Sequence, residues 1–220
     1  MPSSSLRTLG GAAAAVAFCA VMTFPRGLGE DPATLGPPEA AEPGPVGLVD
    51  RVDQQLEERI AALESLQRRV LARTIVSEAE QARIDPLLVL ALIEVESAWD
   101  PTALSGRGAR GLMQLRETTM RRELERHGIP VLDPLDPVAN VRAGVRYFRR
   151  LLDAFGREEV ALMAYNAGPN RILGYLREGE IPERFHVYPR RVRTELRRLR
   201  HSMAPPAPEL AASHVSAGAQ

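Results

Sequence analysis

The sequence predicts an all-α protein made of many short helices, and two observations support that class. Several segments after residue 48 repeat apolar residues at steps of three and four, which is the spacing of a helix buried on one face. No segment of useful length alternates apolar with polar residues, as a half-buried strand does. The chain has 220 residues, which is enough for one domain with a hydrophobic core and further appended segments.

The first residues are typical of a targeting segment followed by a linker. Arg7 precedes an apolar run from Leu9 to Phe24, which is shorter than the ~20 residues that comfortably span a bilayer. We therefore predict that residues 1–29 are a signal peptide or an N-terminal membrane anchor, and both alternatives export the segments that follow. Residues 30–47 are rich in Pro, Gly and Ala, which predicts an extended linker.

The pattern of apolar residues at 48–76 predicts one amphipathic helix, which precedes the main domain. Its apolar residues recur at helical spacing with charges between them: Val49, Val52, Leu56, Ile60, Leu63 and Val70. We place the main domain at residues 77–202, where Ser77 followed by Glu80 suggests the capping box of its first helix. Residues 203–220 are predicted to form a disordered tail.

Within the main domain, the expected helices are separated by turn-rich segments. Pro86 fits the first turn of a helix that continues through Ser97. Residues 100–109 are rich in turn formers and contain no helical pattern. Further helices are expected at about 112–127, 138–155, 158–165, from 171 onward, and 188–201.

Composition limits the classes of function. Basic and acidic residues balance at 28 each, so the net charge is zero and bulk electrostatics indicate no nucleic-acid partner. Cys19 is the single cysteine and lies in the N-terminal apolar run, so the folded part has neither an internal disulfide nor a thiol-based metal site. Because the four His residues also lack the spacing of metal ligands, no metal site is predicted.

One carboxyl group is distinguished by its place on a helix. In the segment 86–97, Glu96 falls on the same face as Leu92 and Ile93, whereas Glu94 points to nearly the opposite side. A carboxyl group on an apolar face is costly to bury, and burial raises its pKa so that it stays protonated, as a general acid requires. From this helix alone, a Glu that simply reaches solvent at the helix end explains the pattern at least as well.

Four motifs give this carboxyl group a context. ESAWDP begins at Glu96 and Ser105 follows nine residues after that glutamate; GARGLMQ ends at Gln114; DPVANVRAGVRY and AYNAGP come next. Together and in this order, they resemble the soluble lytic transglycosylases of bacterial cell-wall metabolism, over about residues 77–195. The resemblance implies the goose-type lysozyme fold, which is a compact all-α domain of many short helices, here preceded by the extra amphipathic helix.

The resemblance also implies roles for residues at the motif positions. Glu96 corresponds to the catalytic acid/base of the family. The residues that match substrate-binding positions are Ser105, which would face the reacting N-acetyl group, Gln114, Tyr147, Tyr165, Asn166 and Tyr188. Tyr188, in Tyr-Pro-Arg-Arg-Val, matches the Tyr of a Tyr-Val-x-Lys-Val element, although the Glu-Thr pair before that element is absent. Arg116 also departs from the family, whose residue at that position is usually apolar.

The family's activity needs one protein carboxyl group, and no second carboxylate stands at a motif position here. The resemblance implies that Glu96 protonates the MurNAc-β-1,4-GlcNAc linkage while the acetamido oxygen of the substrate supports the cation at C1. The C6 hydroxyl of the same sugar then closes a 1,6-anhydro ring without water. The implied partner is the peptidoglycan glycan strand, and neither a metal nor a cofactor takes part.

Two other functions stay open. A muramidase of the same fold would hydrolyse the same bond, and it would need a second group to position the attacking water. A non-catalytic wall-binding module of the envelope is the second. The presence of Glu96 together with Ser105, Gln114 and Tyr165 argues against it. The targeting segment at residues 1–29 predicts an exported protein of the periplasm or cell envelope. The sequence leaves open exo or endo cleavage, membrane anchoring, and association with envelope or secretion machinery.

Overall fold

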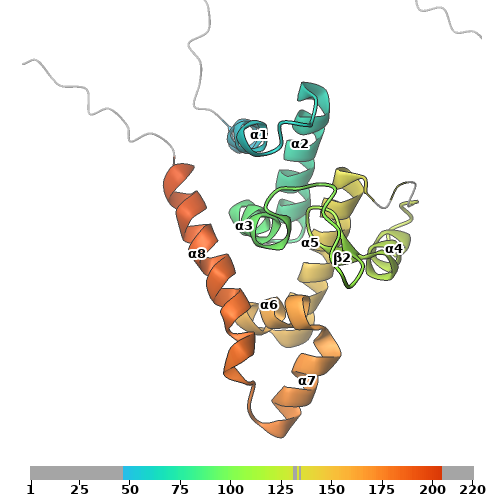
Figure 1. Ribbon diagram of the computed structural model, residues 1–220, viewed down its shortest axis with the longest axis vertical. Helices are drawn as coiled ribbons and strands as arrows, with labels where there is room; N and C mark the ends of the chain where they lie inside the picture. Colours follow the sequence, from blue (N-terminus) through green and yellow to red (C-terminus); the bar gives the residue numbers. More distant parts are fainter. Residues whose placement is uncertain (1–46, 131–132, 134, 205–220) are drawn as a thin grey trace, which may run out of the picture. The chain divides into compact units, whose positions relative to one another are not determined.

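The computed structural model describes residues 47–130, 133 and 135–204. The predicted export segment, the linker up to residue 46 and the tail from residue 205 onward lie outside these residues. Over the described residues the chain folds into eight α-helices and one small antiparallel sheet, so the predicted all-α class is confirmed (Figure 1). None of the described helices is long and apolar enough to cross a lipid bilayer.

The elements follow in order along the chain. The helices are α1 (Leu48–Arg59), α2 (Ser65–Gln81), α3 (Pro86–Ser97), α4 (Glu117–Glu125), α5 (Pro137–Phe155), α6 (Glu158–Ala167), α7 (Pro169–Glu178) and α8 (Val187–Ser202), with the short 3-10 helix η1 (Glu183–Phe185) before the last one. The strands β1 (Ala109–Arg110) and β2 (Leu115–Arg116) pair antiparallel, with Ala109 opposite Arg116.

The middle of helix α3 is buried among its neighbours. It packs against α2 and α8, and every residue from Leu88 to Ile93 is at most 3% exposed (Figure 1). A helix that is apolar all round is stable only when other elements cover it. A carboxyl group near its C-terminal end is therefore held by rigid, packed structure.

The helices from α5 onward begin and end close to the predicted positions. Asp136 caps α5, because its carboxylate accepts hydrogen bonds from the N–H groups of Val138 and Ala139, both at 3.1 Å. Pro137 occupies the first helical position and Gly156, at φ 68°, ends the helix. The helices predicted at 138–155, 158–165, from 171 and at 188–201 are confirmed to within two residues.

The single helix predicted at 48–76 is wrong, because the structure contains two helices there. Glu64 and Gln67 form a capping box, in which the Glu64 N–H donates to Gln67 Oε1 at 3.2 Å, and a new helix starts at that point. Ile60, in the break between α1 and α2, is 4% exposed. The apolar periodicity therefore continues across the break and conceals it.

The helix start predicted at Ser77 is also wrong, since this residue lies inside α2. Its hydroxyl donates to the carbonyl oxygen of Thr74 at 3.3 Å, which is a bond to the preceding turn of the same helix. Helix α2 packs against α1, α3 and α5. The predicted division of the chain before residue 77 thus coincides with no helix end.

The helix predicted from residue 112 begins only at Glu117, and the residues before it form the β1–β2 hairpin. Gly111 has a φ of 72° and Gln114 a φ of 45°. Both values lie in the left-handed region, which an α-helix cannot contain. The segment 109–116 therefore turns tightly instead of continuing as a helix, and this turn carries Gln114.

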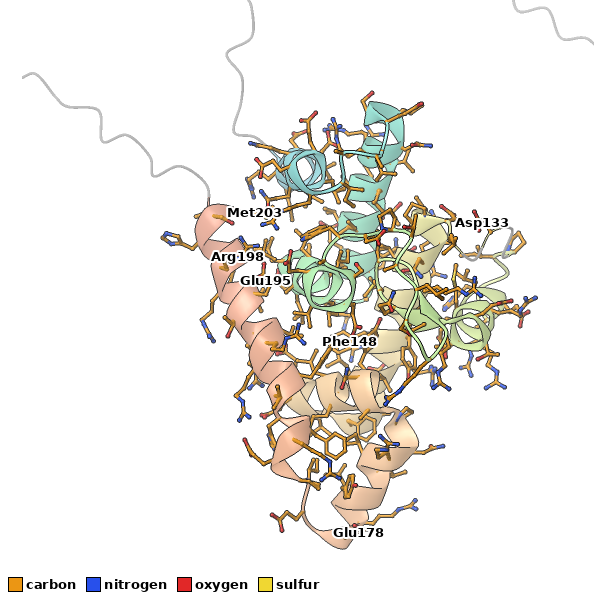
Figure 2. The ribbon with its side chains drawn as sticks, in the orientation of Figure 1. Asp133, Phe148, Glu178, Glu195, Arg198 and Met203 are labelled. Carbon is orange, nitrogen blue, oxygen red and sulfur yellow. The ribbon has the colours of Figure 1, made fainter. Side chains whose placement is uncertain are left out.

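At its C-terminal end the domain extends one residue beyond the predicted boundary. Met203 lies at the end of α8 (Figure 2), is 6% exposed, and donates its backbone N–H to the carbonyl oxygen of Leu199 at 2.8 Å. A buried side chain at this position belongs to the core. The tail predicted from residue 203 is therefore wrong at its first residue.

Candidate active site

The chain turns sharply directly after Glu96. Ala98 and Trp99 have φ values of 49° and 68°, so two consecutive non-glycine residues occupy the left-handed region. Trp99 is 2% exposed and its indole N–H donates to the carboxylate of Glu94, which anchors the turn. Ser97 Oγ donates to the carbonyl oxygen of Leu112 at 2.9 Å and so joins the end of α3 to the β1–β2 hairpin.

Burial decides the protonation of Glu96. Removal from water raises the pKa of its carboxyl group from 4.5 to about 7, and two neighbours on α8 oppose that shift. The Tyr188 hydroxyl donates to Glu96 Oε1, and the guanidinium of Arg191 lies near enough to favour the carboxylate. Near neutral pH the group can therefore both give and accept a proton, as an acid/base must.

The cleft beside Glu96 has a volume of about 560 Å³. Six of the seven predicted site residues line it: Glu96, Ser105, Gln114, Tyr147, Tyr165 and Asn166. Tyr188 is the exception, because it is buried and meets the carboxyl group of Glu96 from α8. The structure thus brings the predicted residues together, with Tyr188 contacting the carboxyl group instead of lining the cleft.

Ser105 and Gln114 each keep one polar group available to a ligand. Ser105 Oγ accepts the backbone N–H of Ala109 at 2.9 Å and that of Arg107 at 3.4 Å, so its own proton remains to be donated. Gln114 Nε2 donates to the carbonyl oxygens of Ala103 and Gly111 at 3.1 and 3.0 Å. The side chain therefore offers its oxygen, Oε1, as an acceptor.

The two tyrosines of the cleft pack against each other, with ring centroids 5.4 Å apart. Tyr165 donates its hydroxyl to the carbonyl oxygen of Met113 at 2.7 Å, and burial together with the nearby charge of Glu96 raises the pKa of its hydroxyl. Its ring also meets the ring of Phe148 edge-on; Phe148 is fully buried in the core and is labelled in Figure 2. Burial likewise raises the pKa of Tyr147, over whose ring the Arg150 guanidinium lies at 5.1 Å. Through its hydrogen bond to Met113, Tyr165 is thus attached to the backbone directly before Gln114.

Helix α5 holds the hairpin against the core through two residues of one face. Asn140 is fully buried; its Oδ1 accepts the Met113 N–H at 2.8 Å and its Nδ2 donates to the Arg110 carbonyl oxygen at 2.9 Å. One turn later, a side chain at Gly144 would come within 2.3 Å of the sulfur of Met113. Their helical spacing in the sequence is the signal that this face supports the segment before Gln114.

Three arginines that no motif nominates also line the cleft. Arg107 lies in the loop after Ser105, Arg116 ends β2, and Arg171 lies in the first turn of α7. The sequence contained one signal, since Arg116 departs from the family pattern. Among the described residues, no group of three or more His, Cys, Asp and Glu side chains could hold a metal ion.

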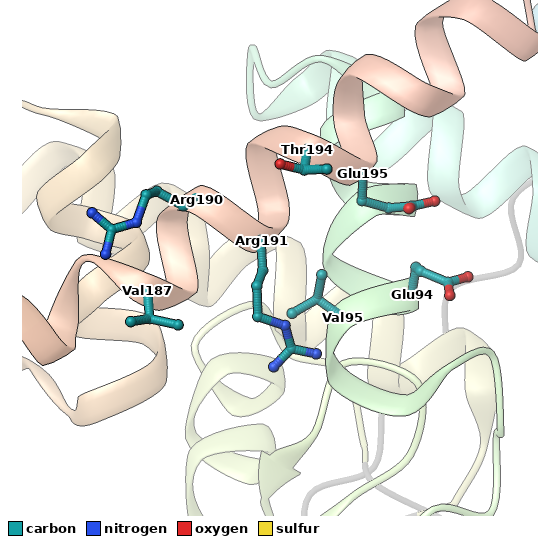
Figure 3. Close-up of a pocket in the computed structure, with 7 residues that line it drawn as sticks. All are labelled: Glu94, Val95, Val187, Arg190, Arg191, Thr194 and Glu195. Atoms are coloured by element: carbon teal, nitrogen blue, oxygen red, sulfur yellow. The ribbon is translucent and has the colours of Figure 1, made fainter.

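A second hollow, of about 450 Å³, lies between α3 and α8 (Figure 3). Glu94 and Val95 line it from α3, and Arg190, Arg191 and Glu195 are among the residues that line it from α8. It shares no lining residue with the cleft at Glu96. Arg191 therefore affects Glu96 from the side of α8, away from the space that a substrate would occupy.

The fold can be compared with solved structures. The chain aligns with the 70 kDa soluble lytic transglycosylase Slt70 of Escherichia coli with a TM-score of 0.54 and 25% identity, over 70% of this chain and 28% of that one. It aligns with the lytic transglycosylase Slt of Pseudomonas aeruginosa with a TM-score of 0.54 and 20% identity, over 73% and 36% of the two chains, which supports the fold alone. The described residues thus form an all-α, lysozyme-like domain, as predicted.

The family is identified by the sequence. Residues 73–185, slightly more than half of the 220 residues, match the Transglycosylase SLT domain. The chain belongs to this family, and the predicted membership is confirmed. The match begins inside α2 and ends at Phe185, so Tyr188 and Arg191 lie beyond it.

Named relatives match over part of their length. The Transglycosylase of Enterobacteria phage PRD1 is 36% identical over 98 residues, which cover 44% of this chain and 35% of the relative. The Membrane-bound lytic murein transglycosylase F of Vibrio cholerae is 36% identical over 132 residues, covering 57% and 23%. The Soluble lytic murein transglycosylase of E. coli is 35% identical over 92 residues, covering 40% and 14%. The chain thus spans about a third or less of the length of these relatives.

Proposed function

We propose that the protein is a peptidoglycan lytic transglycosylase that cleaves the MurNAc-β-1,4-GlcNAc bond and leaves 1,6-anhydro-MurNAc ends. The observation that carries the proposal is the single carboxyl group of the cleft. Glu96 is the one acidic side chain among the described residues that line this space, and burial holds its pKa at about 7. Family membership and the names of the relatives support the same activity.

The chemistry requires one group that works first as an acid and then as a base. Protonated Glu96 gives its proton to the glycosidic oxygen as the bond from C1 to that oxygen breaks. The acetamido oxygen of MurNAc bonds to C1 and carries the positive charge away from it. Glu96, now a carboxylate, takes the proton of the C6 hydroxyl as O6 attacks C1 and displaces the acetamido oxygen. No water is consumed, and Glu96 ends protonated as it began.

The polar groups beside Glu96 suit an acetamido group. An amide offers one carbonyl oxygen that accepts and one N–H that donates. Ser105 has a hydroxyl proton to donate, and Gln114 has an oxygen to accept, because backbone groups occupy their other hydrogen-bonding atoms. We infer that these two side chains orient the acetamido group at C1, while Tyr147 and Asn166 contact the glycan strand.

The products of digested peptidoglycan test the proposal. Purified protein and glycan strands are incubated, and the mass of the newly formed MurNAc ends is measured by mass spectrometry. We expect ends that are one water lighter than a hydrolysed end. Ordinary reducing ends would instead identify a muramidase of the same fold. Intact strands, under conditions in which a known lytic enzyme cuts them, would favour a non-catalytic wall-binding module.

Replacing Tyr188 with Phe is expected to move the alkaline limit of activity to higher pH. The hydroxyl of Tyr188 favours the carboxylate of Glu96, so its loss raises the pKa of that group further above 7. The first chemical step needs protonated Glu96, and turnover falls as pH rises through this pKa. The pH dependence of kcat/KM measures the shift.

Tyr175→Phe is the matched control. Tyr175 lies on α7, and its hydroxyl accepts a hydrogen bond from Arg184 and not from any residue that contacts Glu96. It should leave the pH profile unchanged. A Tyr188→Phe profile identical to that of the wild type, or one displaced to lower pH, would contradict the role of Tyr188.

We also infer that the protein works outside the cytoplasm, in the periplasm or cell envelope. The predicted signal or anchor at residues 1–29 and the membrane-bound relatives support this location. Residues 1–47 fused to a reporter that is active only outside the cytoplasm should give a signal. A silent reporter, with the fusion protein present in the cells, would refute export.

A further inference from the structure

The cleft carries more positive charge than the chain as a whole. Three guanidinium groups line it, those of Arg107, Arg116 and Arg171, against the one carboxyl group of Glu96. The whole chain has a net charge of zero, so this excess is local. Within the described residues, none of the three side chains forms an ion pair or a side-chain hydrogen bond, and all three are exposed. They are therefore free to bind an anion from outside the chain.

Two of these arginines belong to the same structural unit as Ser105. Arg107 lies two residues after Ser105, and its backbone N–H donates to Ser105 Oγ. Arg116 lies opposite Ala109 in the hairpin, and the Ala109 N–H also donates to Ser105 Oγ. The hydroxyl of Ser105 and the two guanidinium groups thus emerge from one loop and hairpin. Arg171 comes from α7, which is a different wall of the cleft.

The substrate has an acidic group next to the group that Ser105 would bind. In MurNAc the acetamido group is on C2, and the lactyl ether is on the neighbouring carbon, C3. The lactyl arm ends in a carboxylate when the strand carries no stem peptide, and otherwise it leads to the carboxylates of that peptide. A guanidinium group binds a carboxylate with two parallel hydrogen bonds, and this geometry gives selectivity as well as affinity.

We propose that Arg107 and Arg116 form a subsite for a carboxylate carried on the lactyl arm of MurNAc. This inference rests on the proposed function, and it assigns the selectivity of the cleft for charged strands to residues beside Ser105. Arg171, on the other wall, adds positive potential to the cleft but lies outside the subsite.

Binding measurements test the subsite independently of cleavage. The full chain carrying Glu96→Gln is titrated with three probes: strands without peptide, strands with stem peptides, and peptide-free strands whose carboxylates have been converted to neutral methylamides. We expect the neutral strands to bind about tenfold or more weakly than the better of the two charged probes. Added salt should weaken the charged probe much more than the neutral one.

Substitution then assigns the effect to the two arginines. Adding Arg107→Gln and Arg116→Gln should weaken the charged probe about 10- to 100-fold and leave the neutral probe unchanged. Arg122→Gln is the control, because Arg122 is an exposed arginine of α4 that lies outside the cleft. An effect on peptide-free strands identifies the lactyl carboxylate as the ligand, and an effect confined to peptide-bearing strands identifies a stem-peptide carboxylate.

Equal loss of affinity for charged and neutral strands, or no loss with either, would overturn the subsite. The same variants in the active chain give a second measurement, in which KM for charged strands should rise about 10- to 100-fold with kcat nearly unchanged. If the wild type binds charged strands selectively but cuts none, the proposed activity fails and the subsite stands. If it cuts all three equally well, the activity stands and the subsite fails.

Discussion

Replacing Glu96 with Gln should abolish nearly all cleavage of glycan strands while the protein stays folded. Glutamine has almost the same shape as glutamate, but it can neither give a proton to the glycosidic oxygen nor take one from the C6 hydroxyl. Loss of a general acid/base typically lowers turnover by about 10²–10⁴. No other described acidic side chain lines the cleft, so we expect the upper part of that range. Release of soluble muropeptides per folded molecule is the measurement.

The neighbouring Glu94→Gln is the matched control. Glu94 accepts the indole N–H of Trp99 and lies 3.4 Å from Arg59, so it serves the packing around α3. Glutamine keeps an oxygen that can accept the Trp99 N–H, and turnover should stay within a few-fold of the wild type. A Glu96→Gln protein that retains a tenth of wild-type turnover would remove Glu96 from the mechanism.

The substitution Glu96→Gln should also stabilise the protein in alkaline solution. Folding raises the pKa of Glu96 from 4.5 to about 7, so the folded state favours the protonated form. The contribution of Glu96 to stability is therefore fully present below the unfolded pKa and is lost as pH rises through the folded one. Glu96→Gln removes this loss, and its free energy of unfolding should exceed that of the wild type by up to about 3 kcal/mol near pH 8.5.

Urea unfolding of both proteins measures the difference, which should shrink as the solution is made more acidic. If the free energy of unfolding depended on pH equally in the two proteins, the raised pKa would not belong to Glu96. The comparison also separates a chemical defect from a folding defect, because an inactive variant that is more stable has not lost activity by unfolding.

Local signals in the sequence were sufficient to predict a helix and its ends where the residues at both ends favour a helix start and a helix stop. Asp136, Pro137 and Gly156 mark α5 in this way, and the structure uses all three. The break after α1 was missed because Ile60 continues the apolar pattern through it. The hairpin before α4 was missed because its turns depend on the φ angles of Gly111 and Gln114, and glutamine is not a residue that signals a left-handed turn.

The residues of the candidate site also fall into those that local sequence signals identify and those that only the folded structure brings together. The motifs were enough to nominate the residues of the cleft, since each motif is a short stretch with its own turn or helix. The contact between Tyr188 and Glu96 joins residues 92 positions apart, and no local pattern encodes such a distance. The three arginines of the cleft were missed for the same reason. They line one space only after a loop, a strand end and α7 have assembled around it.

Replacing Asn140 with Leu should destabilise the protein by about 2–5 kcal/mol and impair the site from a distance. Leucine has a similar size and shape but no polar atom, so the Met113 N–H and the Arg110 carbonyl oxygen would be left without their present partners. A backbone polar group left unsatisfied in the interior costs about 1–3 kcal/mol. Urea unfolding measures this loss as a lower midpoint with an unchanged slope.

The turnover of the folded Asn140→Leu fraction should fall as well, because the two lost bonds fix the backbone on either side of Gly111, and Gln114 follows directly. Asn170→Leu is the control: Asn170 is exposed on α7, and the same change there should alter stability by about 0.5 kcal/mol or less. If Asn140→Leu were as stable and as active as the Asn170 variant, the other contacts of the hairpin, from Ser97, Tyr165 and the packing of Met113 on Gly144, would suffice to hold it. Equal turnover per folded molecule with a large loss of stability would mean that Gln114 keeps its position without this clamp, which would confine Asn140 to a structural role.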